Sequence, residues 1–205
     1  MKNKIIKDAL ALTLITLVAG VTLGGVYEIT KDPIAKQEAQ AKAEAYEQVF
    51  TDAAAFEAVE MDDTLTKTIR DQLDQEGYKA QSIEEVMRAE DQSGETLGYA
   101  FTVVTSEGYG GDIQFSMGVQ NDGTLNGISI LSIGETAGLG MNADTPAFKD
   151  QFVGKQVEKL QYTKNGAAQD DAINAISGAT VTTNAMTNGV NAGLCAFRVM
   201  EGGDQ

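Results

Sequence analysis

Four hydroxyl side chains lie within the seven residues 177–183, which read Ser-Gly-Ala-Thr-Val-Thr-Thr. This segment lies between a short apolar strand that we predict over residues 172–176 and a helix that we predict from about Thr183 to Met200. Backbone N–H groups at a helix start, together with hydroxyls, can bind an anion such as a phosphate. The same residues can instead simply make the turn and cap the helix. The segment lacks the Lys of a phosphate-binding loop, so nucleotide triphosphate hydrolysis is not predicted.

Composition excludes several other chemistries. The chain of 205 residues has no His, which removes the commonest general base and metal ligand. Its single Cys excludes an intrachain disulfide and a protein-ligated iron–sulfur cluster. The net charge of −15 argues against nucleic-acid binding, because nothing would neutralise the phosphates. Any redox chemistry must therefore be carried by an organic cofactor. We expect Cys195 to be a buried small residue rather than a reactive thiol.

The N-terminal segment has the length and polarity of a membrane-spanning helix. Residues 9–27 carry no charge, and about 20 apolar residues suffice to cross the hydrocarbon. Lysines are the only basic residues of the preceding segment, residues 1–8. The positive-inside rule therefore predicts a cytoplasmic N-terminus, with everything after residue 28 outside. A cleaved signal peptide is the alternative, but no small-x-small cleavage site ends the apolar run.

Helices are predicted beyond the membrane segment. Residues 34–59 are rich in Ala, Glu, Gln and Lys and predict a helical stalk with Pro33 near its start. A second helix is predicted over residues 64–76, which a Gly follows. A third is predicted over residues 82–89, whose Ser and Glu have capping-box spacing.

The pattern then changes to one typical of strands. We predict strands over residues 97–105, 112–120 and 125–133. An Asn-Asp-Gly turn separates the second from the third, which indicates an antiparallel meander. We predict that a Gly-rich loop, residues 134–140, then leads to a helical turn near residues 146–152 and a strand near 157–163.

Three segments resemble parts of a known family of FMN-binding domains. The Ser-Gly-Ala-Thr-Val-Thr-Thr segment resembles the flavinylation motif in two related respiratory complexes. These are the Rnf electron-transport complex, where the motif is in the G subunit, and the sodium-pumping NADH:quinone reductase, where it is in the C subunit. Residues 134–140 resemble the Glu-Thr-Pro-Gly-Leu-Gly loop of the same domains, and residues 109–113 resemble the segment before their central strands. The order and spacing of these segments agree with those of the family from about Gly98 onward. The length of the chain is closer to that of the Rnf G subunit than to that of the longer C subunit.

The resemblance implies that Thr180 carries FMN through a phosphoester that a dedicated flavin transferase installs. The residues that would shape the phosphate end are Ser177, Gly178, Ala179, Thr182 and Thr183. The residues that would border the flavin ring are Glu135, Thr136, Gly138, Leu139 and Gly140. Two positions depart from the family pattern, since Ala137 replaces the usual Pro and Asn174 replaces a frequent Asp. The second departure leaves the efficiency of flavin attachment open.

We therefore predict an α+β protein with a single transmembrane helix, a helical stalk and an antiparallel-sheet FMN-binding domain with a C-terminal helix. The predicted division is a cytoplasmic N-terminus (1–8), a transmembrane helix (9–27), an extracytoplasmic stalk with the start of the globular domain (28–95), and the FMN-binding domain (96–205). By the resemblance it is an electron-relay subunit in the cell inner membrane, with no catalytic residues of its own.

The resemblance also implies the partners, which are the other membrane and redox subunits of a complex that moves electrons between reduced ferredoxin and NAD. That complex exports sodium or protons. Three alternatives stay open from the sequence. They are a C-type subunit of the sodium-pumping quinone reductase, a self-contained extracellular flavin reductase, and an anchored binding module without flavin.

Overall fold

The computed structural model describes residues 2–203, and the chain divides into two compact units after Ala41. Residue 1 of the predicted cytoplasmic segment and residues 204–205 of the predicted domain lie outside the described residues. The first unit is helical, and the second holds the sheet and the remaining helices.

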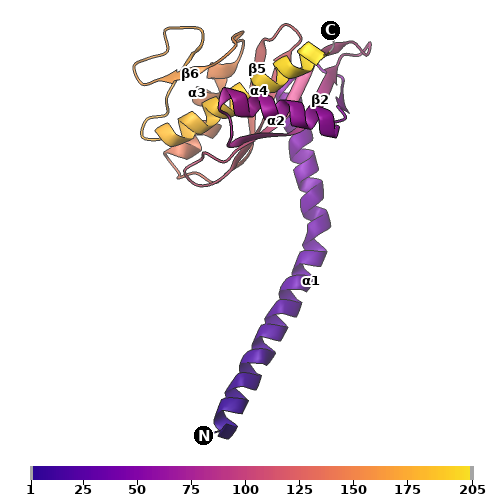
Figure 1. The fold of residues 1–205 in the computed structure, drawn as a ribbon, viewed down its shortest axis with the longest axis vertical. Helices are drawn as coiled ribbons and strands as arrows, with labels where there is room; N and C mark the ends of the chain where they lie inside the picture. Colours follow the sequence, from indigo (N-terminus) through magenta and orange to yellow (C-terminus); the bar gives the residue numbers. More distant parts are fainter. Residues whose placement is uncertain (1, 204–205) are drawn as a thin grey trace. The chain divides into compact units, whose positions relative to one another are not determined.

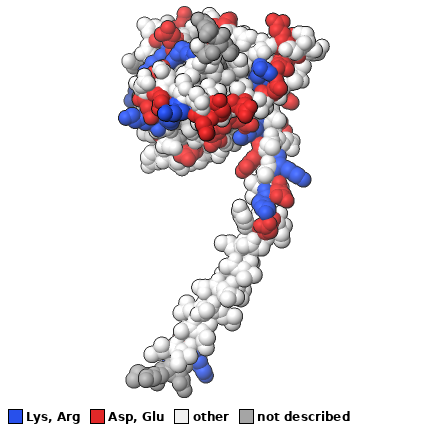
Figure 2. Space-filling view, turned by 45° about the vertical axis from the view of Figure 1, so that its right-hand side comes forward, with Lys and Arg blue, Asp and Glu red and all other residues white. Residues whose placement is uncertain are grey.

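Helix α1 (Lys2–Val49) runs through the whole first unit. It is the one helix, within residues 2–203, that is long and apolar enough to cross a membrane by length and composition. Figure 2 shows its uncharged stretch as a white surface with charged side chains before and after it. The hydroxyls of Thr13 and Thr16 donate to the carbonyls of Ala9 and Leu12 at 2.9 and 3.0 Å. These polar groups are therefore satisfied within the helix, as a hydrocarbon environment requires.

The stalk helix predicted over residues 34–59, as a continuation of the membrane segment, is confirmed as far as Val49 and is wrong beyond it. Pro33 lies inside α1 rather than at a helix start, and α1 ends at Val49. Residues Ala55–Ala58 form strand β1, which pairs with the sheet. Local propensity favours a helix for such an Ala- and Glu-rich segment, but backbone pairing with the neighbouring strand decides its structure.

Five antiparallel strands form a meander in chain order. They are β1 (Ala55–Ala58), β2 (Gln81–Glu90), β3 (Thr96–Thr105), β4 (Ile113–Gln120) and β5 (Leu125–Ile133). The three strands predicted within residues 97–133 and their meander order are confirmed. The helix predicted over residues 82–89 is wrong, because these residues belong to β2, which pairs with β1 on one edge and β3 on the other. Hydrogen bonding on both edges outweighs the local capping-box spacing.

Helices α2 (Asp63–Glu76) and α4 (Thr180–Gly203) lie together over one face of the sheet (Figure 1). Helix α2 is capped by Asp62 and ends at Gly77, which has a φ of 91°, so the predicted helix is confirmed. Helix α4 lies close to β4, since a Cβ on Gly189 would come within 2.8 Å of the Phe115 ring. The largest fully buried side chains of this core include Leu73, Phe101, Phe115, Met117, Phe152, Ile173 and Met186.

The last turns of α1, which belong to the second unit, pack on the sheet through a second apolar cluster. Its buried members are Tyr46, Val49, Phe50, Ala89 and Ala100. The Tyr46 hydroxyl donates to Glu85 Oε2 at 3.0 Å and lies 2.7 Å from Thr102 Oγ1. Burial raises the pKa of the Tyr46 phenol above its ordinary value, and the Glu85 carboxylate adds to the shift. The hydroxyl therefore stays protonated and holds the helix end to the sheet.

Short elements connect β5 to α4. They are the 3₁₀ helix η1 (Gly140–Asp144), α3 (Pro146–Lys149), the 3₁₀ helix η2 (Asp150–Phe152), β6 (Gln161–Thr163) and β7 (Ala172–Asn174). The helical turn predicted near residues 146–152 is confirmed, whereas the strands near 157–163 and 172–176 are shorter than predicted. The predicted α+β arrangement is confirmed. The compact unit begins at Lys42, and the predicted boundary between residues 95 and 96 falls between β2 and β3 of one sheet.

Candidate functional site

The hydroxyl-rich segment forms the turn from β7 into α4. Helix α4 begins at Thr180, earlier than the predicted start at Thr183. Gly178 has a φ of 75°, which favours glycine at this turn, and the Ala179 N–H donates to the Ile176 carbonyl at 3.0 Å. The N–H groups of a first helical turn have no partner within the helix, and the helix dipole attracts negative charge there. Thr180 therefore stands where an anionic ligand would be stabilised.

Thr183 takes the structural role in this turn. Its side chain is fully buried. Its Oγ1 accepts a hydrogen bond from the Ile176 N–H at 3.0 Å and donates to the Ala179 carbonyl at 2.9 Å. The hydroxyl of Thr183 thus ties the turn to the first helical turn, and it faces the protein interior. Thr183 therefore holds the turn in place but does not cap the helix, because the N–H group that it accepts from belongs to Ile176, which precedes α4.

A pocket of about 530 Å³ lies beside the first turn of α4. Its lining residues are Tyr109, Glu135, Thr136, Leu139, Gly140, Gly178, Ala179, Thr180, Val181 and Thr182. The structure thus brings together most of the two groups proposed from sequence, which are more than 35 residues apart in the chain. Ser177, Thr183 and Gly138 are not among the lining residues. Tyr109 and Val181 line the pocket although the sequence did not single them out as site residues.

The loop that follows β5 forms one wall of the pocket. Gly138 has a φ of 77°, and the Leu139 and Met141 N–H groups both donate to the Thr136 carbonyl at 3.1 and 3.2 Å. The loop therefore folds back on itself without the family's usual Pro at position 137. Gly138 shapes this loop from outside the pocket, and it leaves Leu139 half-exposed at the pocket's edge.

Glu135 is a buried carboxylate in the wall of the pocket. Its Oε1 accepts hydrogen bonds from the backbone N–H groups of Tyr109 at 2.7 Å and Gly110 at 3.3 Å. A Cβ on Gly140 would lie 2.5 Å from Glu135 Oε2 and 2.6 Å from Thr182 Oγ1. Glycine at position 140 therefore lets the loop carboxylate and a helix hydroxyl approach each other from two separate elements.

The pocket is lined by both polar and apolar side chains. Thr180 and Thr182 lie at the helix start, and Tyr109, Leu139 and Val181 contribute exposed apolar side chains to the lining. Among the lining residues, Glu135 is the only charged one. The volume is within the range of small-molecule sites, about 300–1,000 Å³. The lining therefore offers hydroxyl and first-turn N–H groups to a phosphate, and apolar side chains to a flat ring.

A second cavity of about 400 Å³ lies beside the end of α1 and is lined by Gln48, Val49, Phe50, Thr51, Asp52, Leu97, Gln120, Asn126 and Val153. None of the three segments with a family resemblance contributes a residue to it. We therefore take the pocket at Thr180 as the candidate functional site.

Asn174 stabilises a loop. Its Oδ1 accepts a hydrogen bond from the Ala167 N–H at 2.7 Å, and its own N–H donates to Gln151 Oε1 at 2.6 Å. The side chain is exposed and is not among the residues that line the pocket. An amide oxygen makes the contact that a carboxylate oxygen would make, so the replacement of Asp by Asn preserves this hydrogen bond.

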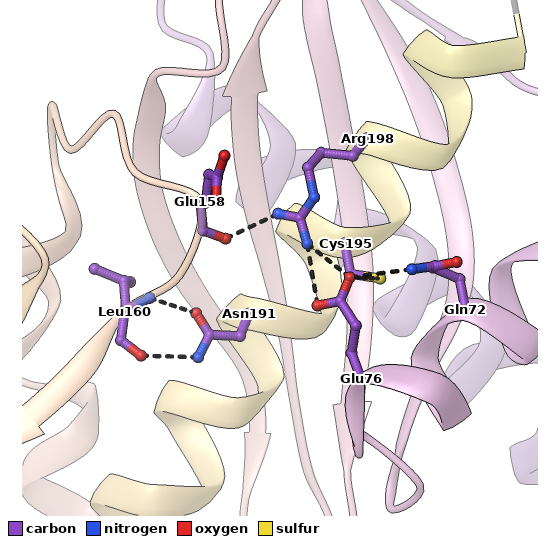
Figure 3. A network of polar contacts seen from close by, with 7 residues as sticks. All are labelled: Gln72, Glu76, Glu158, Leu160, Asn191, Cys195 and Arg198. Atoms are coloured by element: carbon purple, nitrogen blue, oxygen red, sulfur yellow. Dashed lines mark hydrogen bonds and ion pairs between the residues drawn. The ribbon is translucent and has the colours of Figure 1, made fainter.

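Cys195 lies in a polar network between α2 and α4, away from the lining of the pocket (Figure 3). It is buried, as predicted, and its thiol donates to Glu76 Oε1 at 3.4 Å. Burial, with the nearby Glu76 carboxylate, raises the pKa of the thiol to about 12, so it is not a nucleophile at neutral pH. Arg198 also donates to both oxygens of Glu76, at 3.0 and 3.1 Å.

Comparison with known proteins finds two families that match this sequence. The FMN-binding domain family matches residues 108–194, which include every residue lining the pocket, and the RnfG N-terminal region matches residues 1–49. The G subunit of the Na⁺-translocating ferredoxin:NAD⁺ oxidoreductase complex of Acetobacterium woodii is 31% identical over 196 residues, which cover 95% of this chain and 92% of that protein.

The G subunit of the proton-translocating ferredoxin:NAD⁺ oxidoreductase complex of Clostridium ljungdahlii is 28% identical, over 98% of this chain and 96% of that protein. Among solved structures, the C subunit of the Na⁺-translocating NADH-quinone reductase from Parabacteroides distasonis is similar, with a TM-score of 0.48 and 21% identity. That alignment covers 72% of this chain and 77% of that one.

Proposed function

Because this chain belongs to the family of G subunits of ion-translocating ferredoxin:NAD⁺ oxidoreductase complexes, we propose that it is the membrane-anchored electron-relay subunit of such a complex. We propose further that FMN is attached covalently to Thr180. The observation that carries the assignment is the position of Thr180, which opens α4 and lines the pocket within the FMN-binding match.

Different residues of the pocket would hold different parts of FMN. The first-turn N–H groups of α4 would receive the phosphate, and the Thr180 oxygen would form the phosphoester. Leu139 and Val181 would contact the ring, with Glu135 and Gly140 shaping the wall behind them. FMN itself supplies the uptake and release of one or two electrons, and the protein supplies position and electrostatics. The three predicted site residues outside the lining, Ser177, Gly138 and Thr183, would act through the shape of their turns.

Covalent attachment would explain how the phosphate is retained in a pocket whose lining has no cationic side chain. The lining residues include no Lys or Arg to hold a phosphate by ion pairing. A phosphoester would supply this retention instead. A flavin transferase would be the partner that installs it, and Asn174 would preserve the loop contact next to the acceptor segment.

The proposed topology places the flavin outside the cytoplasm. Lys4 and Lys7 precede the apolar part of α1, and basic residues stay on the cytoplasmic side. The unit that begins at Lys42, and the FMN-binding domain within it, would then be extracytoplasmic. The match of residues 1–49 to the RnfG N-terminal region favours an Rnf-type chain over a C-type subunit of the quinone reductase. The partners would be the other membrane and redox subunits of the complex.

Denaturing gel electrophoresis tests the attachment. The full-length chain is produced with and without an active flavin transferase, and flavin fluorescence is recorded in the gel. We expect a fluorescent band at the mass of this subunit, and we expect Thr180→Ala to abolish it because no acceptor oxygen remains.

Thr182→Ala is the matched control, since it removes a hydroxyl from the same pocket and the same helical turn. It should keep the fluorescent band. A dark band from the unmodified chain in cells with an active transferase would refute the proposed function. Fluorescence retained in Thr180→Ala would mean that another residue is the acceptor of the flavin.

A further inference from the structure

Tyr109 is the most exposed large apolar side chain of the second unit within the described residues, at 77%. It lies in the loop between β3 and β4 and lines the pocket. The other exposed large apolar side chains of this unit are Leu139, Val153 and Val181, and two of these three line the same pocket. Exposed apolar groups gathered around one opening mark a binding surface. An aromatic ring at that edge can stack on a flat ligand.

One end of the Tyr109 loop is fixed to the wall of the pocket. Glu135 Oε1 accepts from the Tyr109 N–H at 2.7 Å and from the Gly110 N–H at 3.3 Å. A Cβ on Gly110 would clash with the Gly134 carbonyl and lie 3.2 Å from Glu135 Cα. The two loops are therefore in backbone contact, and the buried carboxylate orients the peptide that carries the Tyr109 side chain.

The other end of the loop is fixed to the helix that carries Thr180. Glu107 Oε2 accepts a hydrogen bond from Asn188 Nδ2 at 2.7 Å and from Asn184 Nδ2 at 3.4 Å. Both asparagines lie on α4, one and two turns after its first residue. Glu107 thus fixes the distance between the Tyr109 loop and the helix start, while Glu135 fixes the loop to the opposite wall.

We propose that Tyr109 is the aromatic wall of the flavin pocket, and that Glu107 and Glu135 are positioning residues that hold its loop against the ring. This inference rests on the proposed function, because the ring is that of the FMN at Thr180. Tyr109 is held only through its backbone, so its phenol ring can turn to lie along a flat ligand without breaking these hydrogen bonds. The pocket would be enclosed on three sides by Tyr109, Leu139 and Val181.

Flavin fluorescence of the folded, full-length, flavin-loaded chain in detergent tests the placement. A phenol ring in contact with an excited flavin quenches its emission by reversible electron transfer. We expect Tyr109→Leu to raise the emission per bound flavin severalfold, and Tyr109→Trp to keep it low because indole quenches as well. Tyr27→Leu is the matched control, since Tyr27 is also exposed, at 68%, and does not line the pocket. It should leave the emission unchanged.

The positioning roles are tested by two pairs of variants. Glu135→Ala and Glu107→Ala remove the acceptor oxygens, so we expect emission to rise as in Tyr109→Leu. Glu135→Gln and Glu107→Gln keep an oxygen that can accept the same hydrogen bonds, so quenching should be retained. Circular dichroism is recorded for each variant. Tyr109→Leu provides the decisive reading if an alanine variant fails to fold, because an exposed side chain is not needed for folding.

Flavin content, measured by fluorescence in the denaturing gel, separates the two proposals. A fluorescent gel band with unchanged native emission in Tyr109→Leu would overturn the role of Tyr109 and leave the attachment to Thr180 intact. A dark gel band in the unmodified chain would refute the proposed function, and the inference with it. High emission in the two glutamine variants would refute the positioning roles alone.

Discussion

Glu135 places a negative charge in a pocket whose other lining residues are uncharged. A nearby negative charge disfavours the addition of electrons to a bound group. We therefore expect Glu135→Gln to raise the midpoint potential of the bound FMN, by an amount on the order of tens of millivolts if the interaction is about 1 kcal/mol. Spectroelectrochemical titration of the full-length chain measures the shift.

Asp144→Asn is the control for this potential, because it also removes one negative charge but lies outside the residues that line the pocket. A long-range effect of net charge would shift both variants alike. A local effect should be confined to Glu135→Gln. An unchanged potential in Glu135→Gln would mean that the carboxylate does not act on the ring.

Glu76 shows a second kind of carboxylate, one that joins two helices. Burial alone would raise its pKa, but hydrogen bonds from Gln72, Arg198 and Cys195 outweigh this and hold the pKa below its ordinary value of 4.5. A carboxyl whose pKa is lowered by folding stabilises the fold above its unfolded pKa, and this contribution is lost as the pH falls through the lower folded value.

We therefore expect Glu76→Gln to lower the free energy of unfolding at pH 7, by less than about 1 kcal/mol for a partly exposed ion pair. The difference from the unmodified chain should shrink as the pH falls below 4.5. Urea unfolding at several pH values measures it. A difference that is constant with pH would show that lost packing, and not the charge, is responsible.

At the residue scale, motif spacing located most of the pocket but not all of it. Thr180 and Glu135 were identified because their segments resemble a family pattern. Tyr109 lies in another segment that resembles the family, but that segment was interpreted only as the residues that precede a strand. Whether its ring would be buried or exposed depends on the backbone contact between two loops, which no local pattern specifies. The hydrogen bonds by which Thr183 holds the turn likewise depend on how the chain folds back from residue 176 to residue 183.

Strand β4 and the end of α1 show how one element constrains another. A Cβ on Gly118 would lie 2.8 Å from the Val49 carbonyl oxygen and 2.9 Å from the Phe50 ring. Because the nearest atom is backbone, the helix end must shift to make room. We expect Gly118→Ala to lower the free energy of unfolding by about 1–3 kcal/mol, as overpacking usually does. Thermal or urea denaturation measures the change.

Gly202→Ala is the control for this substitution. A Cβ on Gly202 meets nothing within 4 Å, and alanine is the better helix former. The control should be neutral or slightly stabilising. Equal stability of Gly118→Ala and the unmodified chain would show that the last turns of α1 are not packed as tightly on β4 as the structure indicates.

At the element scale, the reliable predictions were those with a clear period or a strong turn. The sequence of β4 alternates between large apolar and other residues, an Asn-Asp-Gly turn joins β4 to β5, and α2 has caps at both ends. Strands β1 and β2 were predicted as helix because their residues have good helical propensity. Their structure comes from pairing across the sheet, between residues more than 30 apart in the chain such as Phe56 and Ala89. Such pairing is not visible in a local window.

The whole molecule combines an apolar helix with an acidic folded unit. We propose that this unit is extracytoplasmic, because lysines precede the apolar stretch of α1 and basic residues stay on the cytoplasmic side. Alkaline phosphatase becomes active only outside the cytoplasm, whereas green fluorescent protein exported unfolded stays dark. We therefore expect a C-terminal phosphatase fusion of the full chain in a bacterial host to be active, and the matching fluorescent fusion to be dark.

Replacing Lys4 and Lys7 by Glu, together with Lys2, removes the charges that set this orientation, and we expect phosphatase activity to fall and fluorescence to rise. Changing Lys31 and Lys36 to Gln is the control, because these lysines follow the apolar stretch and their removal should leave the orientation unchanged. An orientation with the folded unit in the cytoplasm would contradict the proposed topology. It would leave the proposed attachment of flavin to Thr180 untouched, since the pocket is complete within the unit that begins at Lys42.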